Sequence, residues 1–165
     1  MRRTNTLVSR PRPFVPPWRT IVIIRYQHTQ LGTLMLVTLV SGAIFFAAMA
    51  YTLPTPARWG LLSGGLLLIV VAWLFSSLTV SVSDSELQWR FGPGLFRYRM
   101  ALADIAGVSI VRNSVLNGFG IRMWPGFRLY NVSGLDAVEL RLRNGDIRRI
   151  GTDDARGLAA ALRRE

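Results

Sequence analysis

The chain has 165 residues, a net charge of +11 and 50% hydrophobic residues. It has no cysteine and one histidine, His28, which excludes a disulfide framework, a cysteine-based metal site and a histidine cluster. A strongly basic chain raises the possibility of nucleic-acid binding. Here six of the arginines precede a long apolar run, so we expect contact with a membrane surface and no nucleic-acid partner.

Residues 1–30 form a basic, proline-containing segment that holds six arginines and no acidic residue. Such a composition predicts disorder when the segment is alone in solution. It has two interpretations: it lies on anionic lipid headgroups, or it follows a partner protein with Phe14 and Trp18 as anchors. The arginines in question are Arg2, Arg3, Arg10, Arg12, Arg19 and Arg25.

Two apolar runs, residues 31–51 and 59–80, are separated by a short loop that contains Arg58. A helix that crosses the hydrocarbon core needs about 20 apolar residues, which each run supplies. The Ala48-Met49-Ala50 sequence is typical of signal cleavage, but the first run is longer than a signal core of about 7–15 residues. The sequence therefore predicts a transmembrane hairpin spanning residues 31–80.

Arginines flank the outer ends of this hairpin, and short basic flanks stay on the cytoplasmic side. We therefore expect both termini in the cytoplasm. Gly60 and Gly64 allow another helix to approach the second span closely. Their partner is either the first span or another subunit. His28 is a headgroup-level residue or a ligand to a pigment or haem. We expect the former, and no cofactor or metal.

Beyond residue 80 the apolar residues alternate with polar ones, which predicts strands. Thr152, Asp153 and Asp154 then offer caps to a helix over residues 155–164, a role that we favour over a metal or acid pair. We expect a bent, partly open antiparallel sheet closed by this helix. Its seven strands are predicted at residues 80–82, 87–91, 96–100, 105–111, 128–131, 137–143 and 146–150.

Three stretches, residues 120–122, 126–140 and 149–154, resemble bacterial membrane proteins with a pleckstrin-homology-like (PH-like) domain. The resemblance implies a PH-like fold for residues 81–165 and a bacterial inner-membrane location. It implies a scaffold rather than an activity. Phosphoinositide-binding members carry basic residues in the first hairpin loop. Here that loop is Ser83-Asp84-Ser85, so we expect no inositol phosphate pocket.

Residues 112–126 interrupt the strands and are predicted to form a long glycine-containing loop. Aromatic residues together with arginine are typical of interface anchors. Three interpretations remain open: the aromatic residues cover the core, contact a protein, or insert into the membrane. The candidate contact residues are Phe119, Arg122, Met123 and Trp124.

These features predict a non-enzymatic accessory or scaffold subunit of a respiratory, photosynthetic or transport complex, whose partners are other integral membrane subunits. The alternative is a membrane-anchored adaptor that binds anionic lipid or a peptide at the cytoplasmic surface. A membrane enzyme would need acid–base pairs or a cofactor motif. We identify neither, so we expect no catalytic residues and no small-molecule substrate.

Overall fold

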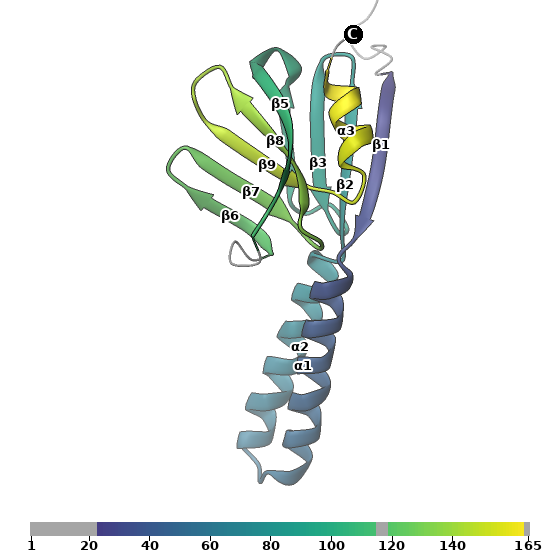
Figure 1. Ribbon diagram of the computed structural model, residues 1–165. Coiled ribbons are helices and arrows are strands. Elements are labelled where there is room, and N and C mark those ends of the chain that lie inside the picture. The colour runs from purple at the N-terminus through teal and green to yellow at the C-terminus, as the bar shows by residue number, and fades with distance from the viewer. Residues whose placement is uncertain (1–22, 115–118, 164–165) are drawn as a thin grey trace, which may run out of the picture.

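The computed structural model describes residues 23–114 and 119–163, in which a β domain sits on a two-helix stalk (Figure 1). Helices α1 (Thr33–Thr52) and α2 (Ala57–Leu74) run antiparallel as a hairpin. Their mean hydropathies of 2.1 and 1.7 make both long and apolar enough to cross a membrane. Most of their large side chains are exposed in the isolated chain, which an apolar surrounding would cover.

The first sheet is antiparallel and extends directly from the hairpin. Its strand order is β1-β2-β3-β4. Leu31 of β1 is paired with Ser77 of β2 at the helix end, and Ile24 with Ser83 at the far end. The strands are β1 (Ile24–Leu31), β2 (Ser77–Ser83), β3 (Glu86–Phe91) and β4 (Arg97–Ala101).

The structure corrects the predicted boundaries at the base of the hairpin. Strand β1 includes residues 24–30, which the sequence assigned to the basic N-terminal segment, and Leu31, which it assigned to the first span; α1 starts at Thr33. The second helix ends at Leu74, so residues 77–80 are strand and not the end of a membrane span. The sequence did not predict β1 because the strand turns polar side chains toward the interior of the domain. Their hydrogen-bond partners are distant in the sequence and cannot be recognised from the local pattern.

The second sheet is mixed, with the order β5-β8-β9-β7-β6. Strands β7 and β9 are parallel, and the other pairings are antiparallel. A short 3-10 helix, η2 (Leu102–Asp104), leads into this sheet. Its strands are β5 (Ile105–Arg112), β6 (Gly120–Trp124), β7 (Phe127–Asn131), β8 (Asp136–Leu142) and β9 (Ile147–Gly151).

The described residues thus form nine strands in two sheets, and the prediction of seven strands in one antiparallel sheet was wrong. The two additional strands are β1 and β6. The C-terminal helix is confirmed as α3 (Ala155–Leu162), which lies against β1, β5 and β8. Because β1 and β5 are edge strands of different sheets, α3 closes the side between them (Figure 1).

Aromatic rings join the inner faces of the two sheets. Trp89 of β3 lies with its ring 5.0 Å from Tyr130 of β7, and Tyr98 of β4 lies 4.9 Å from the same ring. Trp89 and Tyr130 are fully buried, and Leu158 of α3 is buried in the same core. Aromatic pairs at such distances contribute about 0.5–1.5 kcal/mol beyond their burial, so this cluster fixes one sheet against the other.

The stalk joins the β domain without a flexible linker. Only Gly32 separates β1 from α1, and its N–H donates to the Ser76 carbonyl over 2.8 Å. On the other side, the Gly92 N–H donates to the Ser77 carbonyl over 2.8 Å. A Cβ at Gly92 would lie 2.5 Å from the Leu74 carbonyl oxygen, so the β3–β4 turn packs directly on the end of α2.

Replacement of Gly32 by alanine tests this junction. A Cβ there would lie 2.6 Å from the Phe75 carbonyl oxygen. Overpacking of this kind costs about 1–3 kcal/mol, so we expect Gly32→Ala to lower the thermal midpoint of the full chain in detergent, followed by tryptophan fluorescence. Gly107→Ala is the control, because its nearest neighbour is 3.9 Å away. Equal midpoints for wild type and Gly32→Ala would contradict a tight junction.

Candidate functional site

Of the basic N-terminal arginines predicted to contact lipid or a partner, the structure describes Arg25 alone. Its guanidinium pairs with Asp84 in the β2–β3 turn, and both side chains are about half exposed. The pair therefore lies at the end of the sheet farthest from the helices. Arg2, Arg3, Arg10, Arg12, Arg19, Phe14 and Trp18 lie outside the described residues.

The two glycines predicted to pack against another helix, Gly60 and Gly64, have different surroundings. Gly64 faces α1, because a Cβ there would lie 3.0 Å from the Phe46 ring. Gly65 also faces α1, next to the Ala43 carbonyl. A Cβ added at Gly60 would have no neighbour within 4 Å among the described residues. The close helix contact within this chain is therefore made by Gly64 and Gly65, whereas Gly60 leaves its side of α2 open.

Part of the predicted loop over residues 112–126 is strand β6, which forms an edge of the second sheet. We call Gly120–Trp124 the β6 edge. Met123 is 67% exposed and Trp124 is 49% exposed. The Trp124 ring lies 5.5 Å from the Phe127 ring, over which Arg149 stacks at 5.1 Å. Trp124 is thus held in place by packing on one side and exposed on the other.

Arg122, the other charged candidate, is exposed on the β6 edge, and Phe119 is partly buried just before it. Opposite Arg122, Leu129 of β7 is fully buried. Apolar side chains that are large and exposed beside an unpaired strand edge favour contact with another molecule. The β6 edge therefore unites Arg122, Met123 and Trp124 on one element.

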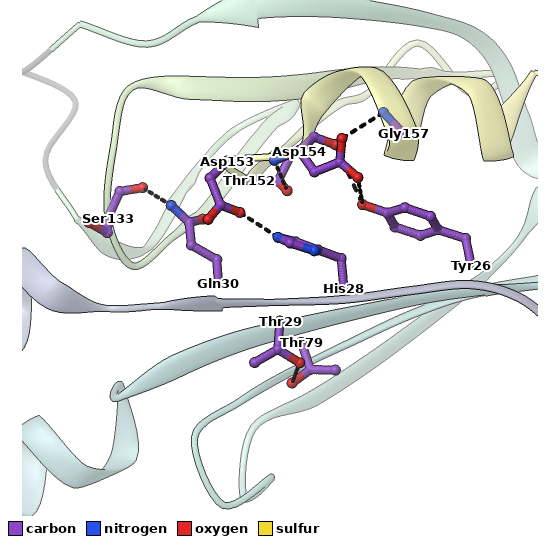
Figure 2. Close-up of polar contacts among 10 residues, drawn as sticks. All are labelled: Tyr26, His28, Thr29, Gln30, Thr79, Ser133, Thr152, Asp153, Asp154 and Gly157. Carbon is purple, nitrogen blue, oxygen red and sulfur yellow. Dashed lines mark hydrogen bonds and ion pairs between the residues drawn. The ribbon is translucent and has the colours of Figure 1, made fainter.

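A polar network joins strand β1 to the start of α3 (Figure 2). The Tyr26 hydroxyl donates to the Asp154 carboxylate over 3.0 Å, and His28 Nε2 lies 2.5 Å from an Asp153 oxygen. Gln30 Nε2 donates to the Ser133 carbonyl over 2.8 Å. Side chains at alternate positions of a strand share a face. All three β1 residues therefore point toward the α3 side.

The two acidic residues at the α3 start differ in role. Asp154 caps the helix, since its carboxylate accepts from the Gly157 N–H over 2.9 Å. This hydrogen bond, followed by the one from Tyr26, holds the pKa of Asp154 below its usual range. Burial and then the Asp154 carboxylate raise the pKa of Tyr26. Asp153 contacts His28 instead, a contact that sequence reasoning missed because it spans 125 positions.

The chemistry open to this network is restricted because both of its carboxylates already have hydrogen-bond partners. Asp154 already accepts two hydrogen bonds, and Asp153 faces the ring of His28. Within residues 23–114 and 119–163, no group of three histidine or acidic side chains is placed to hold a metal ion. The contacts instead connect the strand that enters the stalk to the C-terminal helix, which is a structural role.

No known family model matches this chain, and neither does any curated protein. The fold defines the class of molecule: two helices of membrane-spanning length and composition, joined to a two-sheet β domain by connections of one and two residues. Its function is therefore argued from the geometry.

Asp154→Ala should lower the thermal midpoint at neutral pH, because the cap of α3 and the contact with Tyr26 are both lost. A carboxyl with a lowered folded pKa stabilises the fold above its unfolded pKa and loses that effect as the pH falls through the folded value. The midpoints of wild type and Asp154→Ala should thus converge in acid.

Asp153→Ala is the matched control in the same melting series, since it removes a neighbouring exposed charge and leaves the cap intact. A gap between wild type and Asp154→Ala that stays constant from neutral to acidic pH would contradict the electrostatic part of this explanation.

Proposed function

We propose that this protein is a non-enzymatic accessory subunit, which holds a β domain in a fixed orientation at the membrane and presents it to a larger membrane protein complex. In this proposal α1 and α2 cross the bacterial inner membrane. Both termini and the β domain lie on the cytoplasmic side. The observation that carries the proposal is the junction, where one residue separates β1 from α1 and two separate α2 from β2.

A rigid junction favours a scaffold because it passes orientation from the bilayer to the domain. The β1–β2 pair starts where the two helices end, and the backbone contacts of Gly32 and Gly92 hold the domain directly against those helix ends. A domain that captures soluble ligands does not require a fixed orientation relative to the membrane. A subunit that positions a neighbouring protein does require one.

The β6 edge supplies the contact surface in this proposal. Met123 and Trp124 are exposed apolar side chains next to Arg122, and the outer side of β6 has no strand partner among the described residues. Tryptophan and arginine are enriched among residues that dominate binding energy. In this proposal the partner is another integral membrane subunit, whose cytoplasmic face contacts the β6 edge.

The proposal includes a PH-like identity for the β domain. Its support is the combination of two sheets packed through Trp89 and Tyr130 with a helix, α3, that closes one side. The parallel pairing of β7 and β9 departs from the all-antiparallel sheet that the resemblance implied. A second role, binding of anionic lipid, is favoured by the arginines of the first sheet.

The topology is tested by single cysteines, since the natural chain has none. Ser85→Cys labels the β2–β3 turn and Thr55→Cys labels the loop between the helices. With a membrane-impermeant maleimide, we expect Ser85→Cys to react only in inside-out vesicles and Thr55→Cys only in right-side-out vesicles. Reaction of both from the same side would overturn the membrane hairpin, and the reverse pattern would overturn its orientation.

The accessory role is tested by purification from native membranes in mild detergent. We expect wild type to retain a partner at fixed stoichiometry and Met123→Ala/Trp124→Ala to lose it. Ile110→Ala is the control, because Ile110 is 48% exposed on a different edge strand, β5. A monomer in every mild detergent tried, or equal retention by all variants, would refute the proposed role of the β6 edge.

A further inference from the structure

The outer face of the first sheet carries two adjacent rows of polar side chains. Thr29 faces Thr79, with 2.9 Å between the two hydroxyl oxygens, on the side of β1 opposite the α3 network (Figure 2). In register across the sheet, Thr79 is followed by Arg90 and Arg97. The second row is formed by Gln27, Ser81 and Gln88, which are likewise in register. A hollow of about 270 Å³ lies between the two rows. Its outward side chains are Gln27, Thr79, Ser81, Gln88, Arg90 and Arg97.

Arg90 and Arg97 are a like-charged pair placed directly opposite each other on neighbouring strands. Such a pair is destabilising unless an anion lies near it. Arg97 Nε donates to the Gly94 carbonyl over 2.6 Å, which fixes its position without neutralising it. Among the described residues, neither arginine forms an ion pair with a carboxylate. The acidic residue of this face, Glu86, lies farther along β3 and accepts from Gln88.

The length of α2 indicates where Arg90 and Arg97 lie relative to the bilayer. The 18 residues of α2 rise about 27 Å, close to the hydrocarbon thickness of about 30 Å. Strand β2 starts at Ser77, after the two residues that follow α2, and Thr79 lies two residues farther, which adds about 7 Å to the rise of that short connection. Arg90 and Arg97 are paired in register with Thr79 and therefore lie just outside the hydrocarbon core, on its headgroup side, when α2 spans the bilayer.

The adjoining β3–β4 turn presents an apolar contact at the same end of the sheet. Leu95 is 71% exposed, and the turn that holds it packs on the end of α2 through Gly92. An arginine pair with a neighbouring exposed leucine matches the two parts of a phospholipid, its phosphate and the start of its acyl chains. Guanidinium groups suit phosphate because they donate several hydrogen bonds in one plane.

We propose that this hollow binds the phosphate of an anionic phospholipid from the same leaflet, with Arg90 and Arg97 as the binding residues. The inference rests on the membrane insertion proposed above. The site is distinct from the first hairpin loop of the β domain, which lies at the far end of the sheet and carries Asp84. Bound lipid would supply the anion that offsets the Arg90–Arg97 repulsion.

The test measures lipid binding to the full chain in detergent by native mass spectrometry. The probes are phosphatidylglycerol and phosphatidylcholine with identical acyl chains. We expect wild type to prefer phosphatidylglycerol, and Arg90→Gln/Arg97→Gln to bind it about 30-fold more weakly, the effect of two lost arginine contacts. Arg141→Gln/Arg156→Gln removes the same charge from β8 and α3 and should keep the preference.

Two results would overturn the proposal: an unchanged preference in Arg90→Gln/Arg97→Gln, or an equal loss in both double variants, which would indicate general charge attraction. Displacement of the lipid by inorganic phosphate at equal concentration would assign the hollow to a soluble ligand instead. Alkaline carbonate extraction of native membranes separately tests insertion. Release of the chain there refutes the membrane proposal, whatever the micelle measurement gives.

Discussion

The backbone pairing of β1 with β2 is the constraint on which the rest of this structure depends. It places the start of α1 next to the end of α2, so that the first sheet begins directly at the two helices. The hydrogen bond from Gly32 to Ser76 leaves no slack between them. The first sheet, with the Arg90–Arg97 pair, takes its position relative to the stalk from this pairing, and the contacts of Trp89 and Tyr98 with Tyr130 then place the second sheet with its β6 edge.

Much of the architecture could be predicted from the sequence, because its signals are local. Continuous apolar runs indicate the two helices, alternation indicates most strands, and Asn144-Gly145 indicates the β8–β9 turn. The cap at Asp154 was also predictable from residue type and position, and the structure confirms its bond to Gly157. Each of these signals lies within a few residues of the feature it predicts.

The features that could not be predicted depend on distant partners. Strand β1 carries Tyr26, His28 and Gln30 on its inner face, a polar pattern that becomes favourable only when Asp154, Asp153 and Ser133 lie opposite. Strand β6 lies between glycines and a proline that are typical of loops. The arginine pair has no sequence signal either, because Arg90 and Arg97 become neighbours only through the β3–β4 register.

The pairing of Thr29 with Thr79 has a consequence for biosynthesis. These partners are 50 positions apart, and both helices lie between them. A ribosome therefore completes the whole hairpin before the first strand finds its neighbour. Closing the loop between them in solution carries an entropic cost, which insertion of the hairpin into lipid would lower by aligning the two helix ends. In that setting the bilayer acts as a template for the sheet, since β1 can pair with β2 only after both helices have been synthesised.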